Sequence, residues 1–158
     1  MLTIKMLISD IDGVMTDGGI YYTEGGERIK KFNVYDTMAL TIISKKGIKP
    51  AIVYAGESPI VNHVANDLNI EHRYENVTNK YELARELCLK EGISLDHLAF
   101  IGDDTNDLEL MKNAGLAACP GNAPKAIKDL HNVLVLKRSG GEGAVREFVD
   151  YIIKNGFC

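Results

Sequence analysis

Paired aspartates occur at two places in the chain, and together they could hold a divalent cation beside a phosphate. The first run is Asp10-Ile11-Asp12-Gly13, and the second is Gly102-Asp103-Asp104-Thr105-Asn106-Asp107. Carboxylates gathered at one site repel one another, and without compensation some would have to take up protons. Magnesium relieves this repulsion through oxygen ligands and also pairs with phosphate. Helix capping explains one aspartate at a helix start but not two pairs, so the pattern predicts a magnesium site.

Each acidic run directly follows an apolar segment with the composition of a buried strand. Residues 4–8 precede Asp10, and residues 98–101 precede Asp103. In open α/β sheets, ligands bind outside the carboxyl ends of the parallel strands. Asp12 lies two residues after Asp10 and should point the same way along an extended backbone. We therefore expect these three carboxylates to converge at one edge of the sheet.

Strand-like and helix-like segments alternate along the whole chain. This alternation predicts an α/β fold with a doubly wound parallel sheet, and the length of 158 residues predicts one domain over residues 1–158. The expected strands are 4–8, 50–54, 72–74, 98–101, 116–118 and 133–135, and the expected helices are 37–46, 58–69, 79–92, 105–113, 124–131 and 142–154.

A predicted β-hairpin interrupts the alternation just after the first strand. Residues 20–22 and 28–32 are rich in strand formers and flank the turn Glu24-Gly25-Gly26-Glu27. Such an apolar hairpin is unsuited to stand alone in water, so we expect it to contact another chain. Its apolar residues are Ile20, Tyr21, Tyr22, Ile29 and Phe32.

The bulk composition excludes several classes of partner. A net charge of −4 provides neither a basic surface for nucleic acid nor a polybasic patch for a membrane. Residues 1–9 are too short an apolar run for a signal peptide or a membrane span. The three cysteines have no C-x-x-C spacing, which argues against a disulfide framework or a zinc site. We expect a cytoplasmic protein that acts on a small molecule.

The motifs resemble those of the haloacid dehalogenase (HAD) superfamily. Residues 10–18 are similar to its first motif, Lys80 to its third-motif lysine, and residues 102–107 to its fourth motif. The resemblance is closer to one capless branch, the phosphatases of 3-deoxy-2-keto sugar acid phosphates. The further matching segments are the hairpin and residues 32–36, 58–61 and 140–147. The resemblance implies a Rossmann-like HAD core with a hairpin flap and no cap domain, because the gaps after motifs one and two are too short for another domain.

This resemblance implies a reaction and a role for each motif. Asp10 would attack phosphorus and become an aspartyl-phosphate, while Asp12 would act as general acid and then general base. The side chains of Asp10 and Asp103 and the backbone carbonyl of Asp12 would hold Mg²⁺. Lys80 would neutralise charge on Asp10 and on the phosphoryl oxygens, with a solvated lysine in a first helical turn as the alternative. Asp104 and Asp107 are weaker candidates for metal or supporting roles.

The implied substrate is a sugar acid phosphate, either KDO 8-phosphate or KDN or sialic acid 9-phosphate. The residues expected to contact it are Asn33, Asp36, Gly56, Glu57, Ser58 and Arg146. The resemblance also implies a homotetramer in which the hairpins associate and the glycine-rich segment 140–143 reaches a neighbour's active site. The alternative for this segment is a turn before a capped helix.

One departure from the family pattern concerns the second motif. The family places Thr or Ser there, followed by Gly, to bind the phosphoryl group, whereas this chain has Tyr54-Ala55-Gly56. Tyr54, Ser58 or backbone N–H groups at the start of the next helix are candidates to replace the missing hydroxyl. Loss of one donor to a transition-state charge costs about 10²–10³ in rate, so reduced activity is one reading.

Two other functions remain open from the residues alone. An acidic pair, an acceptor Asp and a Lys on a doubly wound sheet also occur in phosphoacceptor signalling domains, although their acceptor follows the third strand. The departure at Tyr54 is compatible with a weakly active or inactive module that organises a sugar nucleotidyltransferase as an oligomer. Intact Asp10, Asp12 and Asp103 argue against this second reading.

Overall fold

Parallel strands form the centre of the protein in the computed structural model, which describes residues 2–158. The sheet has the strand order β5-β4-β1-β6-β7-β8. The strands are β1 Met6–Ser9, β4 Lys49–Val53, β5 His72–Tyr74, β6 Leu98–Ile101, β7 Leu116–Cys119 and β8 Val133–Val135. Because β1 pairs with β4 on one side and β6 on the other, the predicted doubly wound topology is confirmed.

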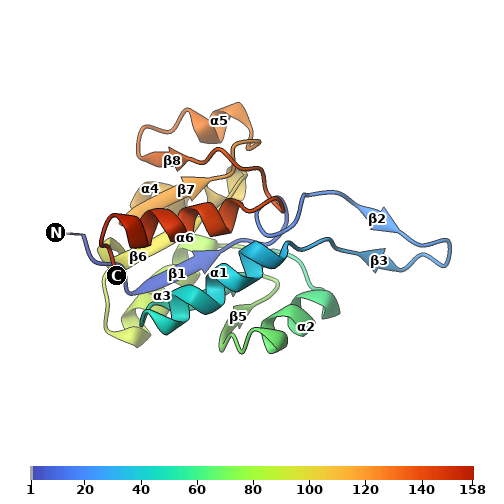
Figure 1. Cartoon of the computed structure of the whole chain (residues 1–158), viewed down its shortest axis with the longest axis horizontal. Helices are drawn as coiled ribbons and strands as arrows, with labels where there is room; N and C mark the ends of the chain where they lie inside the picture. Colours follow the sequence, from blue (N-terminus) through green and yellow to red (C-terminus); the bar gives the residue numbers. More distant parts are fainter. Residues whose placement is uncertain (1) are drawn as a thin grey trace.

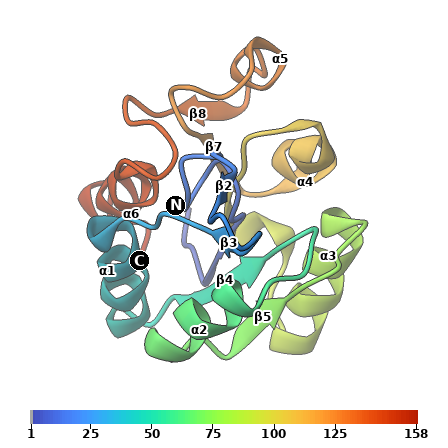
Figure 2. The same ribbon diagram turned by 90° about the vertical axis from the view of Figure 1, so that its right-hand side faces the viewer.

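Helices cover both faces of this sheet (Figure 1, Figure 2). On one face lie α1 (Val34–Lys45), α2 (Pro59–Asp67) and α6 (Ala144–Lys154), and on the other lie α3 (Lys80–Glu91), α4 (Leu108–Asn113) and α5 (Lys125–Lys128). Successive strand side chains point to opposite faces, so Leu7 of β1 joins the first core while Met6 and Ile8 join the second. Burial on both faces explains why β6 is continuously apolar and β1 nearly so.

Polar caps and a glycine set the helix boundaries. The Asn33 side chain accepts the N–H of Tyr35, so α1 begins three residues before its predicted start. The Asn79 side chain accepts the N–H of Glu82 at the start of α3, and that helix ends at Gly92 with a φ of +67°. The predicted helix over 105–113 is divided into the 3₁₀ turn η2 (Thr105–Asp107) and α4.

The β-hairpin projects away from the body of the protein (Figure 1). Its strands β2 (Tyr21–Tyr22) and β3 (Arg28–Ile29) are antiparallel and shorter than predicted. A bridge between Thr16 and Phe32 ties its base to the first acidic loop. Ile20 is 77% exposed, and the other exposed apolar side chains of the hairpin are Tyr21, Tyr22 and Ile29. The apolar surface predicted for the hairpin is therefore present, except that Phe32 is partly buried and packs against the first core.

A short turn precedes β6, and a glycine precedes the last helix. A 3₁₀ turn, η1 (Leu95–His97), leads directly into β6. α6 begins at Ala144, two residues later than predicted, after Gly143 with a φ of +99°. Within residues 2–158, no helix has both the length and the apolar character needed to cross a bilayer.

Candidate active site

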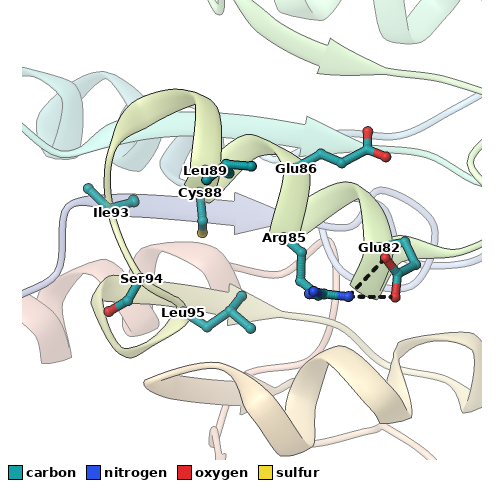
Figure 3. Close-up of a pocket in the computed structure, with 8 residues that line it drawn as sticks. All are labelled: Glu82, Arg85, Glu86, Cys88, Leu89, Ile93, Ser94 and Leu95. Carbon is teal, nitrogen blue, oxygen red and sulfur yellow. Dashed lines mark hydrogen bonds and ion pairs between the residues drawn. The ribbon is translucent and has the colours of Figure 1, made fainter.

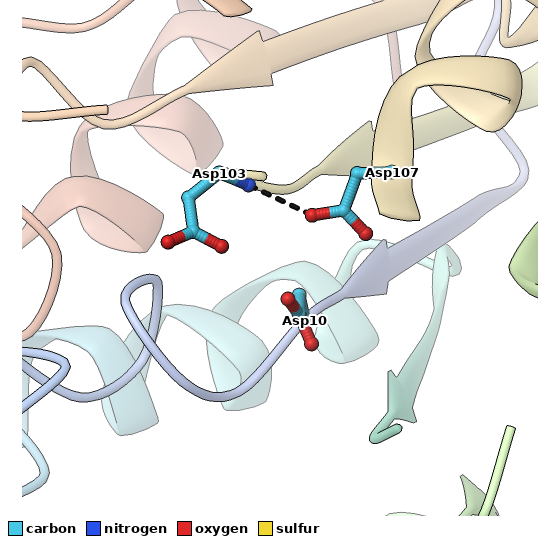
Figure 4. Close-up of side chains that lie close together, drawn as sticks. All are labelled: Asp10, Asp103 and Asp107. Atoms are coloured by element: carbon cyan, nitrogen blue, oxygen red, sulfur yellow. Dashed lines mark hydrogen bonds between the residues drawn. The ribbon is translucent and has the colours of Figure 1, made fainter. Parts of the chain in front are cut away.

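The two acidic runs meet at the carboxyl edge of the sheet, as predicted. Asp10 directly follows β1, while Asp103 and Asp107 come from the loop and turn after the neighbouring strand β6 (Figure 4). One carboxylate oxygen from each of the three side chains lies within 4.8 Å of the other two. Carboxylate oxygens gathered this closely can share a hard cation.

Lys80 at the start of α3 lies against this cluster and is almost completely buried. Its Nζ is 2.9 Å from Asp10 Oδ2 and 2.6 Å from Asp107 Oδ1. Burial by itself lowers the pKa of Lys80, but the charges of Asp10 and Asp107 outweigh it and raise the pKa overall. The alternative of a solvated lysine is wrong, and the contact with Asp10 that its predicted role needs is present.

Asp107, a weaker candidate from the sequence for a metal or supporting role, holds the second acidic loop together. Its Oδ2 accepts the backbone N–H of Asp103 at 2.9 Å and that of Asp104 at 3.2 Å. A Cβ on Gly102 would lie 2.5 Å from the same oxygen, so the loop closes this tightly only with glycine there. The signal in the sequence was the capping-box spacing between Asp104 and Asp107. Asp107 thus supports Asp103 and Lys80 from behind.

The cluster carries an excess of negative charge. Burial, and next the charge of Asp107, raises the pKa of Asp10 to about 6. Burial, and next the charges of Asp10 and Asp107, raises the pKa of Asp103 to about 7. Both shifts mean that Lys80 alone does not compensate the carboxylates. An all-oxygen donor set with uncompensated negative charge fits Mg²⁺.

A glycine allows the two acidic loops to approach each other. Gly13 has a φ of +79°, and a Cβ built there would lie 2.0 Å from Asp103 Oδ2. A side chain at this position would therefore collide with the carboxylate as well as strain the backbone. In the same loop, Asp10 Oδ1 accepts the N–H of Ile11 at 2.8 Å, which fixes the orientation of the carboxylate.

Asp12 points toward the hairpin instead of joining the three clustered carboxylates. Its Oδ1 is 2.6 Å from the Nζ of Lys30, a residue that the sequence did not single out. The same ammonium lies 5.1 Å from the centroid of the Tyr54 ring. Burial lowers the pKa of Lys30, but the hydrogen bond to Asp12 helps to raise it overall. The predicted metal contact of Asp12 uses its backbone carbonyl and stays a prediction.

A cavity of about 540 Å³ opens over the carboxylates, a size that suits a small ligand. Its lining combines Asp10, Asp12, Asp103 and Asp104 with the segment 54–56. Gly56 is thus the member of the predicted substrate-binding set that lines the cavity.

Three other predicted substrate residues make different contacts. Asn33 caps α1, and Glu57 accepts a hydrogen bond from the Asn76 side chain at 3.3 Å. The backbone N–H of Ser58, at the start of α2, donates to Glu75 Oε1 at 3.1 Å. A carboxylate therefore already takes the Ser58 N–H, which corrects the expectation that this N–H replaces the missing hydroxyl, whereas a role for the Ser58 hydroxyl stays a prediction.

Asp36 is fully buried, which corrects the expectation that it contacts substrate. Its Oδ2 accepts the N–H of Gly143 at 3.1 Å, and its Oδ1 accepts the N–H of Arg146 at 3.0 Å. A carboxylate at the start of α6 satisfies free backbone donors and suits the helix dipole. The Arg146 guanidinium pairs with Asp150 on its own helix, with Nε 2.9 Å from Oδ1, and its predicted substrate contact stays a prediction.

The glycine-rich segment packs against the first acidic loop of its own chain, and the expectation that it also reaches a neighbour's active site stays a prediction. A Cβ on Gly140 would lie 1.9 Å from the carbonyl oxygen of Gly13. The N–H of Gly141 donates to the carbonyl of Val14 at 3.0 Å. The segment forms a turn before α6, and it supports the first acidic loop from outside.

A second cavity, of about 350 Å³, lies beside α3 (Figure 3). Its Arg85 guanidinium is 3.2 Å from the carboxylate of Glu82, so these two charges compensate each other. The cavity with four carboxylates is therefore the candidate active site.

A doubly wound sheet with acidic loops after β1 and β6 and a buried lysine defines a phosphate-handling hydrolase of the haloacid dehalogenase type. The family described as haloacid dehalogenase-like hydrolase matches residues 60–147. The chain therefore belongs to the haloacid dehalogenase-like hydrolases.

Within that family, the chain is similar to phosphatases of one sugar acid phosphate. It is 36% identical over 151 residues to the 3-deoxy-D-manno-octulosonate 8-phosphate phosphatase of Yersinia pestis, which covers 95% of this chain and 80% of the relative. The Moraxella catarrhalis enzyme, solved in complex with magnesium ion, phosphate ion and KDO, is 34% identical with a TM-score of 0.91, covering 98% of this chain and 89% of the other. The cobalt-bound Haemophilus influenzae phosphatase is 33% identical with a TM-score of 0.90, covering 96% and 88%.

Proposed function

We propose that this protein is a magnesium-dependent phosphatase that hydrolyses 3-deoxy-D-manno-octulosonate 8-phosphate. The observation that carries the proposal is the position of Asp10, which lies against Lys80 and within 4.8 Å of Asp103 at the floor of the cavity. The names of the similar phosphatases support the choice of substrate. The nine-carbon KDN or sialic acid 9-phosphate is the second candidate, because it is the same class of sugar acid ester.

The proposed reaction has two steps. A carboxylate oxygen of Asp10 attacks phosphorus, and the bond from phosphorus to the sugar oxygen breaks while Asp12 donates a proton to that oxygen. Water then attacks the phosphorus of the aspartyl-phosphate, and Asp12 accepts a proton from the water. Inorganic phosphate leaves, and the Asp10 carboxylate is restored.

In this proposal, the metal and Lys80 neutralise different negative charges at the site. Asp10, Asp103 and the backbone carbonyl of Asp12 would hold Mg²⁺, which when bound would offset the negative charge of the phosphoryl oxygens. Lys80 keeps Asp10 in place through a 2.9 Å contact and lowers the repulsion that an approaching phosphate dianion meets.

Phosphate release from the octulosonate ester tests this function. We expect many turnovers with Mg²⁺ and loss of activity with a chelator, and we expect Asp10→Asn to lower kcat by roughly 10⁴-fold or more. Asp129→Asn, in an exposed pair with Lys125 on the edge of α5, is the matched control and should leave kcat unchanged. Release of one phosphate per chain would instead indicate a phosphoacceptor domain. Failure to hydrolyse any sugar phosphate in a panel would favour an oligomerisation module.

The proposal includes assembly into a homotetramer through the hairpins. Its support is the exposed apolar surface of a projecting element, with Ile20 77% and Tyr22 57% exposed. Light scattering of the purified protein measures the mass, and Ile20→Glu should shift it to a smaller species. If the unsubstituted protein is a monomer, the proposed assembly is wrong, but the proposed phosphatase activity is unaffected.

A further inference from the structure

Lys30 reaches back from the projecting hairpin to the rim of the active-site cavity. It follows β3 directly, yet its side chain is only 12% exposed. Its ammonium contacts Asp12 at 2.6 Å and lies 5.1 Å from the centre of the Tyr54 ring. Both of these residues line the cavity, so Lys30 stands behind its wall on the hairpin side.

The charges of the cavity leave a place for such a cation. Among the described residues that line it are four carboxylates and neither a lysine nor an arginine. Lys80 is already paired with Asp10 and Asp107 beneath the floor. A sugar acid phosphate brings a carboxylate as well as a phosphate, and a bound metal serves only the phosphate. Recognition of the carboxylate therefore needs another cation at the rim, because an unpaired anion beside aspartates is repelled.

A neighbouring groove extends the cavity along the hairpin. This hollow of about 210 Å³ shares Asp12 and Gly18 with the active-site cavity, and Arg28 and Lys30 line it. Residues two apart along extended backbone face the same side, which places both cations along one wall. In an octulosonate 8-phosphate, the carboxylate and the phosphate stand at opposite ends of the carbon chain. A ligand with its phosphate at Asp10 can thus direct its carboxylate across Gly18 toward Lys30.

We propose that Lys30 is a specificity-determining residue that recognises the carboxylate of the sugar acid. This inference rests on the proposed function. When the sugar acid binds, the Lys30 ammonium leaves the Asp12 carboxylate and pairs with the substrate carboxylate. Lys30 therefore has an anionic partner in both states. Asp12 is then free to face the leaving oxygen. A sugar phosphate without a carboxylate leaves the ion pair between Lys30 and Asp12 intact.

The test compares a sugar phosphate that has a carboxylate with one that has none. The kcat/KM of Lys30→Met is measured with 3-deoxy-D-manno-octulosonate 8-phosphate and with mannose 6-phosphate, both with Mg²⁺. We expect the ratio of the two values to fall by roughly 10- to 100-fold, the loss typical of a charged hydrogen bond. Lys30→Arg should retain most of the preference. Lys31→Met is the matched control, because this adjacent lysine is 51% exposed and pairs with Glu142 away from the cavity.

A binding measurement keeps the test independent of turnover. Calorimetry of the unphosphorylated sugar acid should show weaker binding to Lys30→Met and unchanged binding to Lys31→Met. Equal losses of kcat/KM for both substrates would overturn the proposal, because Lys30 would then act only through Asp12. An unchanged affinity for the sugar acid would overturn it as well. A protein that hydrolyses neither ester but binds the acid through Lys30 would refute the proposed function and retain this inference.

Discussion

The Nζ of Lys80 lies 2.6 Å from Oδ1 of Asp107, and both side chains are buried beneath the cavity. The same ammonium contacts Asp10, so one ion joins the end of β1 to the turn that follows β6. The position of the proposed nucleophile therefore depends on Asp107, a residue that the cavity lining does not include.

Removal of the Lys80 charge should impair both stability and activity. Lys80→Met leaves Asp10 and Asp107 buried without their partner, and breaking a buried ion pair in this way costs about 3–5 kcal/mol. Urea unfolding measures the loss. Adding Asp107→Asn to Lys80→Met should recover part of the stability, because one unpaired charge is removed, while kcat stays low. If the losses in unfolding free energy of the two single variants simply add in the double variant, the two side chains do not interact as described.

Metal removal should make stability depend on pH. The pKa values of about 6 for Asp10 and about 7 for Asp103 exceed the ordinary 3.8. Between the ordinary and the raised pKa values, the folded protein therefore binds more protons than the unfolded chain. The free energy of unfolding of the metal-free protein should therefore fall as pH rises through this window. Calorimetry with chelator should show a higher melting temperature at about pH 5.5 than at about pH 7.5.

Two controls separate this effect from general acid sensitivity. Asp17 and Glu91 have lowered pKa values, so the stability linked to them is lost only at more acidic pH. Magnesium should reverse the slope, because it binds the ionised carboxylates. Asp103→Asn should flatten the slope of the metal-free protein, and an undiminished slope in that variant would contradict the assignment.

Gly140→Ala should displace the first acidic loop. The added Cβ would lie 1.9 Å from the carbonyl oxygen of Gly13, a backbone atom that cannot move without the loop. We expect a loss of about 1–3 kcal/mol in stability and a lower kcat. Gly25→Ala is the control, since its Cβ would meet only the Thr23 hydroxyl at 3.7 Å on the exposed hairpin turn. Equal kcat values for the two variants would show that the turn does not support the loop.

Tyr54→Phe tests how this chain compensates for the missing Thr or Ser. The variant keeps the ring that lies near Lys30 and removes only the hydroxyl. Tyr54 lines the cavity, and we propose that its hydroxyl is the donor to the phosphoryl group, so we expect kcat to fall by roughly 10²-fold. Tyr151→Phe, on α6, is the control for loss of a phenol. An unchanged kcat in Tyr54→Phe would show that another group supplies the donor.

Local sequence patterns were enough to predict the strand and helix alternation, the doubly wound topology and the convergence of Asp10 and Asp103. These features depend on local patterns: apolar runs of strand length, capping residues and acidic residues directly after two strands. The family resemblance added Lys80, whose contact with Asp10 is present.

Long-range packing determines which side chains support the cavity and which face it. Asp36 was expected at the substrate, but its carboxylate binds the backbone of Arg146, 110 positions away, because α1 and α6 pack side by side. Lys30 meets Asp12 only because the hairpin folds back to its base. Such contacts join residues far apart in the chain, and local propensity carries no information about them.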